Sequence, residues 1–179
     1  MTSAAIPREE FSPLVKTIIV PWTPEVAFKR WTTDIATWWP VKTHSVGQKK
    51  VKTLVFGSGV GGRLYEIWED GTEQEWGRVT AWDPPRMVRY TWYPDRTPES
   101  AQDIEVRFDP EGSSTRLTLT HTGWERLGQE ARKARRGYPI GWEYVMRTYA
   151  GKKGPLVYAL DLVGMIMRAV SREPVSRKP

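Results

Sequence analysis

A small set of ionisable side chains in this sequence could carry out acid–base chemistry. They are His121, Glu66, Glu75 and Arg63, with Tyr90 and Tyr144 as weaker candidates. Leu117 and Leu119 alternate with polar residues before His121, so a strand there turns the imidazole to the same inward face. A histidine beside a carboxylate such as Glu66 could act as a general base. A buried neutral histidine, bonded to backbone or to a neighbouring threonine, is the alternative, and both stay open.

The sequence does not support a metal site, a disulfide or a phosphate-binding loop. Arg63 and Glu66 are three residues apart, so in a strand they point to opposite faces and we expect no ion pair between them. The chain has no cysteine and two histidines, which argues against disulfides, thiolate metal sites and a histidine-rich zinc site. The glycine-rich stretch 57–62 lacks the lysine of a phosphate-binding loop. We therefore expect no metal and no cofactor.

Large aromatic side chains are the second candidate feature, because the chain has ten tryptophans. Aromatic rings lining a cavity would supply apolar area and stacking for a small molecule, with indole nitrogens setting its orientation. The alternative is that the rings only fill a core. The candidate ligand-lining residues are Trp39, Tyr65, Trp68, Trp76, Tyr90, Trp92, His121, Trp142 and Met146.

The elements that must position these residues begin with a strand over residues 14–20. Thr23-Pro24-Glu25 then predicts a helix start, through a cap, a proline at the first helical position and an acidic first turn. We expect this helix to reach about Thr33 and a second short helix to end near Trp38-Trp39-Pro40, where proline stops it.

Strands dominate the middle of the chain. Residues 51–56 form one, and residues 61–92 read as three strands joined at Asp70-Gly71 and Asp83-Pro84-Pro85. Alternation around residues 104–108 and 117–121, across a turn at 112–114, predicts the last two. We expect seven strands in all. They should pair antiparallel, because strands and helices do not alternate along the chain as they do in a parallel sheet.

The carboxyl-terminal third reads as helical. We expect a helix over 125–136, an interruption at Gly137-Tyr138-Pro139 and a helix over 140–150. Residues 155–170 are nearly all apolar and predict an added helix, too short to span a membrane. Packing on the domain or a homodimer contact explains its apolar surface, and peripheral binding to an anionic membrane is the less favoured alternative.

The net charge of +6 is unevenly distributed. Residues 1–120 have 15 Lys+Arg against 16 Asp+Glu (net −1), and residues 121–179 have 12 against 5 (net +7). The basic residues suggest solvated helix faces and a basic tail, and no nucleic-acid motif accompanies them. The amino terminus shows no signal-peptide pattern, so we expect a cytoplasmic protein.

Several short motifs in one order carry a family resemblance over residues 12–151. They are Thr23-Pro24-Glu25, Trp38-Trp39-Pro40, Gly61-Gly62-Arg63 with Glu66, Asp70-Gly71, Trp76-Gly77-Arg78-Val79, Asp83-Pro84-Pro85, Thr91-Trp92, His121-Thr122-Gly123-Trp124 and Gly141-Trp142. In this combination the sequence resembles the START-like (SRPBCC) superfamily, in the group named after the activator of the ninety-kilodalton heat-shock protein's ATPase.

The resemblance implies an α+β helix-grip fold, in which a curved seven-stranded antiparallel sheet wraps a long carboxyl-terminal helix around a hydrophobic cavity. The resemblance covers the domain (12–151), and the residues after it depart from the family. We therefore divide the chain into an arm (1–11), the domain (12–151), an added helix (152–171) packed on the domain or at a dimer contact, and a basic tail (172–179). Binding of a small hydrophobic or aromatic molecule is the function the resemblance favours. The alternatives are a cyclase- or hydratase-type enzyme with His121 as acid or base, and a protein-interaction or co-chaperone-like module. We do not expect activation of a chaperone, because the co-chaperone that gives the family its name has a separate amino-terminal chaperone-binding domain for which we see no room in this sequence.

Overall fold

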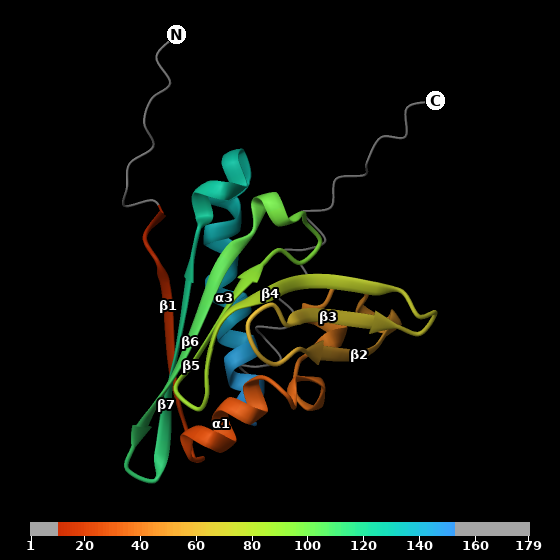
Figure 1. The fold of residues 1–179 in the computed structure, drawn as a ribbon. Helices are drawn as coiled ribbons and strands as arrows, with labels where there is room; N and C mark the ends of the chain where they lie inside the picture. The colour runs from red at the N-terminus through yellow and green to blue at the C-terminus, as the bar shows by residue number, and fades with distance from the viewer. Residues whose placement is uncertain (1–10, 153–179) are drawn as a thin grey trace, which may run out of the picture.

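A single curved sheet of seven strands forms the frame of the computed structural model, which describes residues 11–152 (Figure 1). The strand order is β1-β7-β6-β5-β4-β3-β2, and every neighbouring pair is antiparallel. The strands are β1 (Leu14–Val20), β2 (Val51–Phe56), β3 (Arg63–Trp68), β4 (Glu73–Asp83), β5 (Met87–Trp92), β6 (Gln102–Glu111) and β7 (Ser114–Thr122). The predicted sheet is confirmed, including its first strand, the three strands within residues 61–92 and the antiparallel pairing.

Local sequence explains most of this sheet. Gly71 has φ +84° in the turn between β3 and β4, a backbone region that glycine enters without steric cost. In β6 and β7 buried and less buried residues alternate, which places Leu117, Leu119 and His121 on one inward face, as the sequence predicts. Strand β1 pairs with β7 from Leu14↔His121 to Val20↔Thr115, so the first and last strands in the sequence lie side by side.

The helical segments agree with prediction at the amino-terminal side. Helix α1 (Pro24–Trp31) starts where Thr23-Pro24-Glu25 predicts and ends two residues before the expected Thr33. The predicted second short helix is the 3₁₀ turn η2 (Ile35–Thr37). The helical segments without a sequence prediction are α2 (Val41–His44), η3 (Gln48–Lys50) and η4 (Pro98–Ser100).

The predicted interruption at residues 137–139 is wrong. Helix α3 (Ala131–Tyr149) continues through Pro139, and the chain bends instead at Gly128, within η5 (Trp124–Glu130). Proline removes one helical hydrogen bond, but the buried stripe of Trp142, Val145, Met146 and Tyr149 packs against the sheet side of the molecule. Tertiary packing of this stripe outweighs the local cost.

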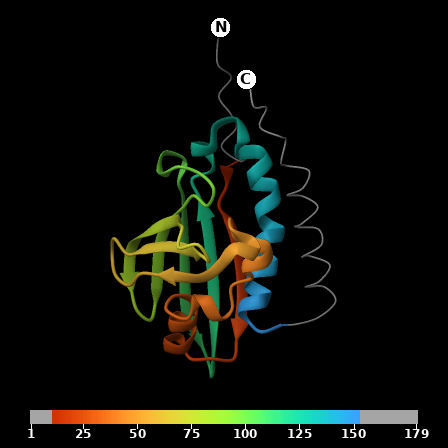
Figure 2. The same cartoon turned by 90° about the vertical axis from the view of Figure 1, so that its right-hand side faces the viewer.

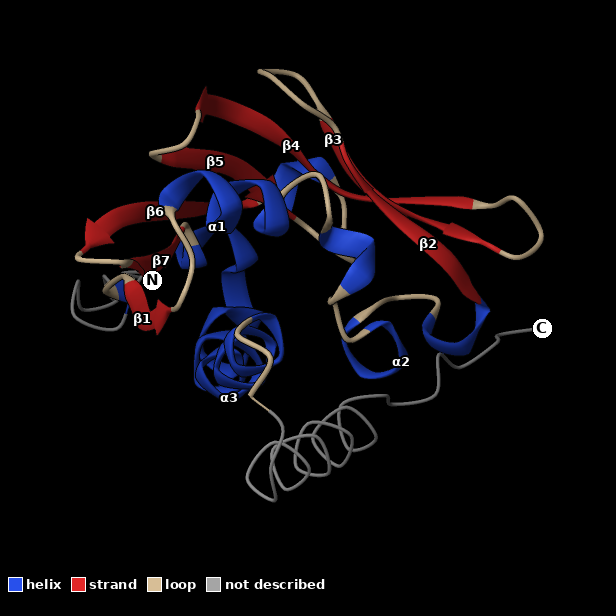
Figure 3. Cartoon of the chain, turned by 90° about the horizontal axis from the view of Figure 1, so that it is seen from below, coloured by secondary structure: helices blue, strands red, loops and turns tan. Residues whose placement is uncertain are grey.

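The layers are clearest along the axis of α3. Figure 3 shows α3 end-on beneath the concave side of the sheet, and Figure 2 shows it running along the strands. Helix α1 packs against β6 and β7, and α3 contacts β1. In Figure 3, α2 lies between α3 and β2. The core therefore lies between the sheet and the helices.

Three predicted segments fall wholly or mostly outside the described residues. They are the amino-terminal arm, the added helix over 155–170 and the tail over 172–179. From the arm, Phe11 is described, and it is partly buried against the hydrophobic core. Among residues 11–152 no helix is long and apolar enough to cross a membrane.

Candidate functional site

Four tryptophans meet between α3 and the sheet. We call Trp39, Trp76, Trp92 and Trp142 the tryptophan tetrad. They come from the loop after η2, from β4, from β5 and from α3, and all four are buried. Five pairs of their rings have centroids 5.3–6.3 Å apart, in tilted or edge-to-face arrangements. Such pairs favour one another beyond their buried area, so the tetrad is a dense aromatic interior.

Beside the tetrad lies a polar contact buried in aromatic surroundings. Trp142 Nε1 donates a hydrogen bond to His121 Nδ1 over 3.0 Å. The His121 ring lies 3.9 Å from the ring of Trp124 and 4.7 Å from that of Tyr138, and its side chain is buried. Trp92 Nε1 donates to Tyr138 Oη over 3.1 Å. The hydrogen-bond partner of His121 is therefore Trp142 and not a carboxylate, and this bond links β7 to α3.

The charge state of His121 follows from this burial. Loss of water contacts, with a smaller effect from the positive Arg135, lowers the pKa of the imidazole well below its usual value. The ring is therefore neutral near pH 7. Because an indole nitrogen can only donate, His121 Nδ1 must be the unprotonated nitrogen, and Nε2 carries the hydrogen.

Acidification from pH 7 to pH 5 should destabilise the domain through His121, by at most about 2 kcal/mol. The unfolded imidazole, with a pKa near 6.5, binds a proton in this range, whereas the lowered pKa of the folded imidazole shifts its protonation to lower pH. The free energy of unfolding therefore falls as the pH drops below about 6.5. The lowered pKa values of Glu75, Glu105 and Glu143 act only below about 4.5. Urea unfolding at pH 7, 6 and 5 checks the change, and a folded-state NMR titration of His121 with a midpoint near 6.5 would contradict it.

Glu66 has a structural position. Its buried carboxyl group accepts hydrogen bonds from Val46 N (3.1 Å), Gly47 N (2.6 Å) and Trp68 Nε1 (2.7 Å). A Cβ on Gly47 would lie 2.4 Å from Trp68 Nε1, so the loop approaches this indole closely. Glu66 therefore anchors the loop between α2 and η3 to β3, and it has no contact with His121 in the hydrogen bonds of the described residues.

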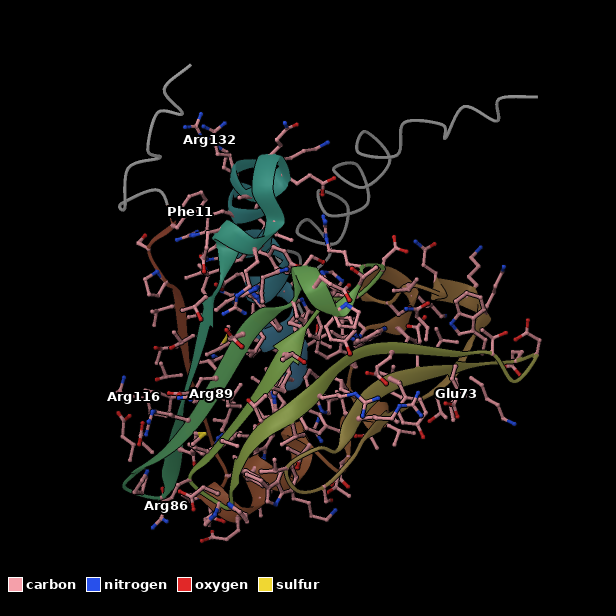
Figure 4. All side chains as sticks on the ribbon, turned by 45° about the horizontal axis from the view of Figure 1, so that its top comes forward. Phe11, Glu73, Arg86, Arg89, Arg116 and Arg132 are labelled. Carbon is pink, nitrogen blue, oxygen red and sulfur yellow. The ribbon has the colours of Figure 1, made fainter. Side chains whose placement is uncertain are left out.

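Arg63 and Glu75 belong to a separate network outside the core. Arg63 bonds Glu75 over 2.7 Å and Glu73 over 2.9 Å, and its guanidinium lies 4.3 Å from the centre of the Tyr65 ring. As predicted, Arg63 does not pair with Glu66. Tyr93 Oη donates to Glu75 Oε1 over 2.5 Å, and burial together with this carboxylate raises the pKa of Tyr93 to about 12. Figure 4 labels Glu73, at the start of β4.

The two tyrosines among the weaker candidates, Tyr90 and Tyr144, lie in different surroundings. Tyr90 is buried beside Phe56 and Trp92, and burial raises the pKa of its hydroxyl above the usual value. Tyr144, on α3, stacks on His44 of α2 with ring centroids 4.7 Å apart. Among the hydrogen bonds of the described residues, neither tyrosine is a partner of His121.

Seven of the nine candidate lining residues are buried. These are the tetrad with Tyr90, His121 and Met146. Tyr65 alternates with the inward Leu64 and Glu66, so it lies on the outer face of β3. Trp68 is half-buried, bonded to Glu66, with the Lys50 ammonium 5.4 Å from its ring centre. Neither Tyr65 nor Trp68 joins the tetrad.

Two aromatic residues whose rings pack on His121 were not among the candidates. Trp124 lies just after the left-handed Gly123 that ends β7, and Tyr138 lies one turn before Trp142 on α3. The one-turn spacing of Tyr138 and Trp142 is visible in the sequence, but the expected break at 137–139 leaves Tyr138 outside the helix. Trp124 carried no periodic signal, because it sits in a short 3₁₀ segment.

Surface depressions lie away from this interior. One, of about 460 Å³, is lined by residues of the outer face of the sheet: Thr80, Arg89, Asp103, Glu105, Thr120 and Thr122 (Arg89 is labelled in Figure 4). Another, of about 480 Å³, lies between β1 and the end of α3. Among residues 11–152 no group of three or more His, Cys, Asp or Glu side chains could hold a metal ion.

Comparison with protein families gives one match. The family described as Activator of Hsp90 ATPase homolog 1-like protein matches residues 21–148, which includes the whole tetrad and His121. No curated protein matches the chain.

Solved structures with this fold include a protein named as a synthase and one named as a resistance protein. The chain is 36% identical to the anthrahydroquino-gamma-pyrone synthase Txn09, over 68% of this chain and 84% of that one, with a TM-score of 0.52. It is 25% identical to the self-sacrificing resistance protein CalC from Micromonospora echinospora, over 80% and 94% of the two chains, with a TM-score of 0.58. Protein MLL2253 from Mesorhizobium loti is 17% identical over 78% and 95%, with a TM-score of 0.56.

Proposed function

Since the chain belongs to the family of Activator of Hsp90 ATPase homolog 1-like proteins, a START-like group, we propose that it binds a small aromatic molecule between α3 and the sheet. The observation that carries this proposal is the tryptophan tetrad. Residues 39, 76, 92 and 142 are far apart in sequence, yet their rings converge in one place. Rings from four elements offer stacking surfaces on several sides of a planar guest.

The energetics support binding by such a surface. A ligand that loses about 300 Å² of apolar surface gains about 7 kcal/mol before the cost of association. Part of the gain is spent on separating rings that now contact each other, so we expect affinity in the micromolar range. One relative is named as the synthase of a small molecule, an anthrahydroquino-gamma-pyrone, and this name supports the same class of function here.

Access to the interior is proposed at α2. This helix is four residues long and none of its residues is buried. It is attached to the tetrad by the bond from Trp39 Nε1 to His44 O (2.7 Å) and to α3 by the stack of His44 on Tyr144. Movement of so short a segment, with Glu66 holding its far end, would open the interior while the sheet stays intact.

Equilibrium dialysis with fluorene, a planar tricyclic hydrocarbon, tests the proposal. We expect saturable binding at micromolar concentration, weakened about tenfold or more in Trp39→Ala, which removes one wall of the tetrad. Trp22→Ala is the matched control, because Trp22 packs on Tyr149 outside the tetrad and should leave binding unchanged. Circular dichroism verifies that each variant is folded. Absence of saturable binding of both fluorene and its ketone, 9-fluorenone, to the folded parent protein contradicts the proposal.

Catalysis in the same interior is a second candidate, supported by the 36% identity to a synthase. The geometry argues for a particular role of His121. Its Nδ1 is occupied by Trp142, and its lowered pKa keeps the ring neutral, so Nε2–H is arranged to donate a hydrogen bond and not to remove a proton. If a reaction occurs here, His121 would polarise a carbonyl oxygen of the substrate.

A further inference from the structure

Three buried N–H groups near the tetrad have no hydrogen-bond acceptor among the described residues. They are Trp76 Nε1, Trp124 Nε1 and His121 Nε2. An indole nitrogen is a donor only, and the bond from Trp142 makes His121 Nε2 a donor as well. All three missing partners are therefore acceptors.

Buried donors without acceptors are rare in folded proteins, because each costs free energy relative to its hydrated state. The other indole groups close by do not share this feature. Trp39 Nε1 donates to His44 O, Trp92 Nε1 to Tyr138 Oη and Trp142 Nε1 to His121 Nδ1. The deficit is thus confined to particular positions and is not a general property of the aromatic interior.

These positions lie at two ends of the row of rings. Trp76 is in contact with Trp39 and Trp92, at centroid distances of 5.3 and 5.7 Å. At the other end, beyond Trp142, the rings of His121 and Trp124 lie 3.9 Å apart. A guest lying along the tetrad would meet donors at its extremities and aromatic faces along its body.

The charges of the buried side chains limit further which class of ligand could bind here. The buried polar and charged side chains of the described residues are Thr32, Ser45, Glu66, Gln102, Thr115 and His121, with no lysine or arginine among them. Arg135 lies beside these donors, with its guanidinium 5.6 Å from the centre of the Trp124 ring, but it is only partly buried. An anionic guest would therefore meet no fully buried cation, and burial of an unpaired charge is costly. Neutral oxygen acceptors fit the three neutral donors.

Building on the proposed function, we propose that the ligand of this domain is a neutral aryl ketone or quinone, whose carbonyl oxygens accept hydrogen bonds from His121 Nε2, Trp124 Nε1 and Trp76 Nε1. The tetrad recognises the planar rings, and the three donors select carbonyl-bearing rings over plain hydrocarbons. A site built to donate to an oxygen rejects an analogue that lacks it, because its donors then stay unpaired.

Fluorene and 9-fluorenone form a matched pair of probes, because they differ only by a CH₂ group in place of the C=O group. Dialysis against the parent protein should give a three- to tenfold lower dissociation constant, roughly, for 9-fluorenone. The single carbonyl of 9-fluorenone can meet the donors at one end only, so either Trp124→Phe or Trp76→Phe, which remove one donor each and keep a ring, should reduce this preference. The matched control Trp82→Phe alters a tryptophan that packs on Phe28 and Phe56 and should leave the preference unchanged.

Indole N–H resonances of the parent protein give a readout that needs no variant. Adding 9-fluorenone should move the Trp76 or Trp124 Nε1–H signal downfield, as expected for a new hydrogen bond, while fluorene should not. Trp38 Nε1–H, already bonded to Arg30 O over 2.6 Å, is the internal reference.

The outcomes separate the two proposals. Binding of both probes with equal affinity, or a preference for 9-fluorenone that survives in both variants with both indole signals unmoved, overturns the ketone inference and leaves the proposed function standing. Failure of both probes to bind the folded protein overturns the proposed function and the inference that rests on it.

Discussion

Replacing Gly77 by alanine should lower the free energy of unfolding by about 3 kcal/mol or more, among the largest effects of a single methyl group in this domain. Gly77 lies in β4 opposite Leu64 of β3, close to a register shift in that pairing. A Cβ there would lie 1.8 Å from the carbonyl oxygen of Thr91 on β5. Because the obstacle is backbone, the strands themselves must move apart.

Urea unfolding measures this effect as a shift in the midpoint. Gly137→Ala is the matched control, since a Cβ at this position of α3 meets nothing within 4 Å. There alanine should be neutral or stabilising by up to about 1 kcal/mol, through its better helix propensity. Equal midpoints for Gly77→Ala and the parent protein would show that β4 and β5 do not approach as closely as the structure indicates.

Removing the side chain of Trp142 should cost about 3–5 kcal/mol of stability in Trp142→Ala. The ring is buried against Trp39 and Trp92, and its nitrogen supplies the donor for His121 Nδ1. Trp142→Phe keeps most of the apolar contact but removes this donor, so we expect a smaller loss of about 1–3 kcal/mol.

Comparing Trp142→Ala with Trp142→Phe separates the contribution of packing to stability from the contribution of the hydrogen bond to His121. Tyr65→Ala is a suitable control, because this ring lies on the outer face of β3 and its loss should change stability by about 1 kcal/mol or less. Thermal or urea unfolding checks all three. If Trp142→Ala were as stable as Tyr65→Ala, α3 would not be held to the sheet through the tetrad.

Much of the fold could be predicted from local patterns. Residues 14–20 and 51–56 were predicted as strands, and β1 and β2 have these bounds, because alternation and turn residues set them within a few positions. The prediction failed at residues 137–139. Pro139 and Gly137 are helix breakers by propensity, yet burial of Trp142, Val145 and Tyr149 along one stripe keeps α3 continuous.

The candidate site was predictable only in part. The inward direction of His121 followed from alternation with Leu117 and Leu119. Its partner did not, because Trp142 lies 21 residues away on another element, and Glu66 proved to be bonded to the loop at Val46 and Gly47 instead. Sequence spacing says which face a side chain occupies, but not which side chain of another element it meets.

By itself, the sequence determined the seven strands, their hairpin turns and the face on which His121 lies, because strand periodicity and turn chemistry act over a few residues. The tertiary structure alone decided that Trp39, Trp76, Trp92 and Trp142 meet. It also decided that the buried N–H groups of Trp76, Trp124 and His121 lack acceptors among residues 11–152. The physical reason is that such meetings depend on the curvature of the sheet and the position of α3 across it. Both result from the packing of the whole domain and not from any one segment.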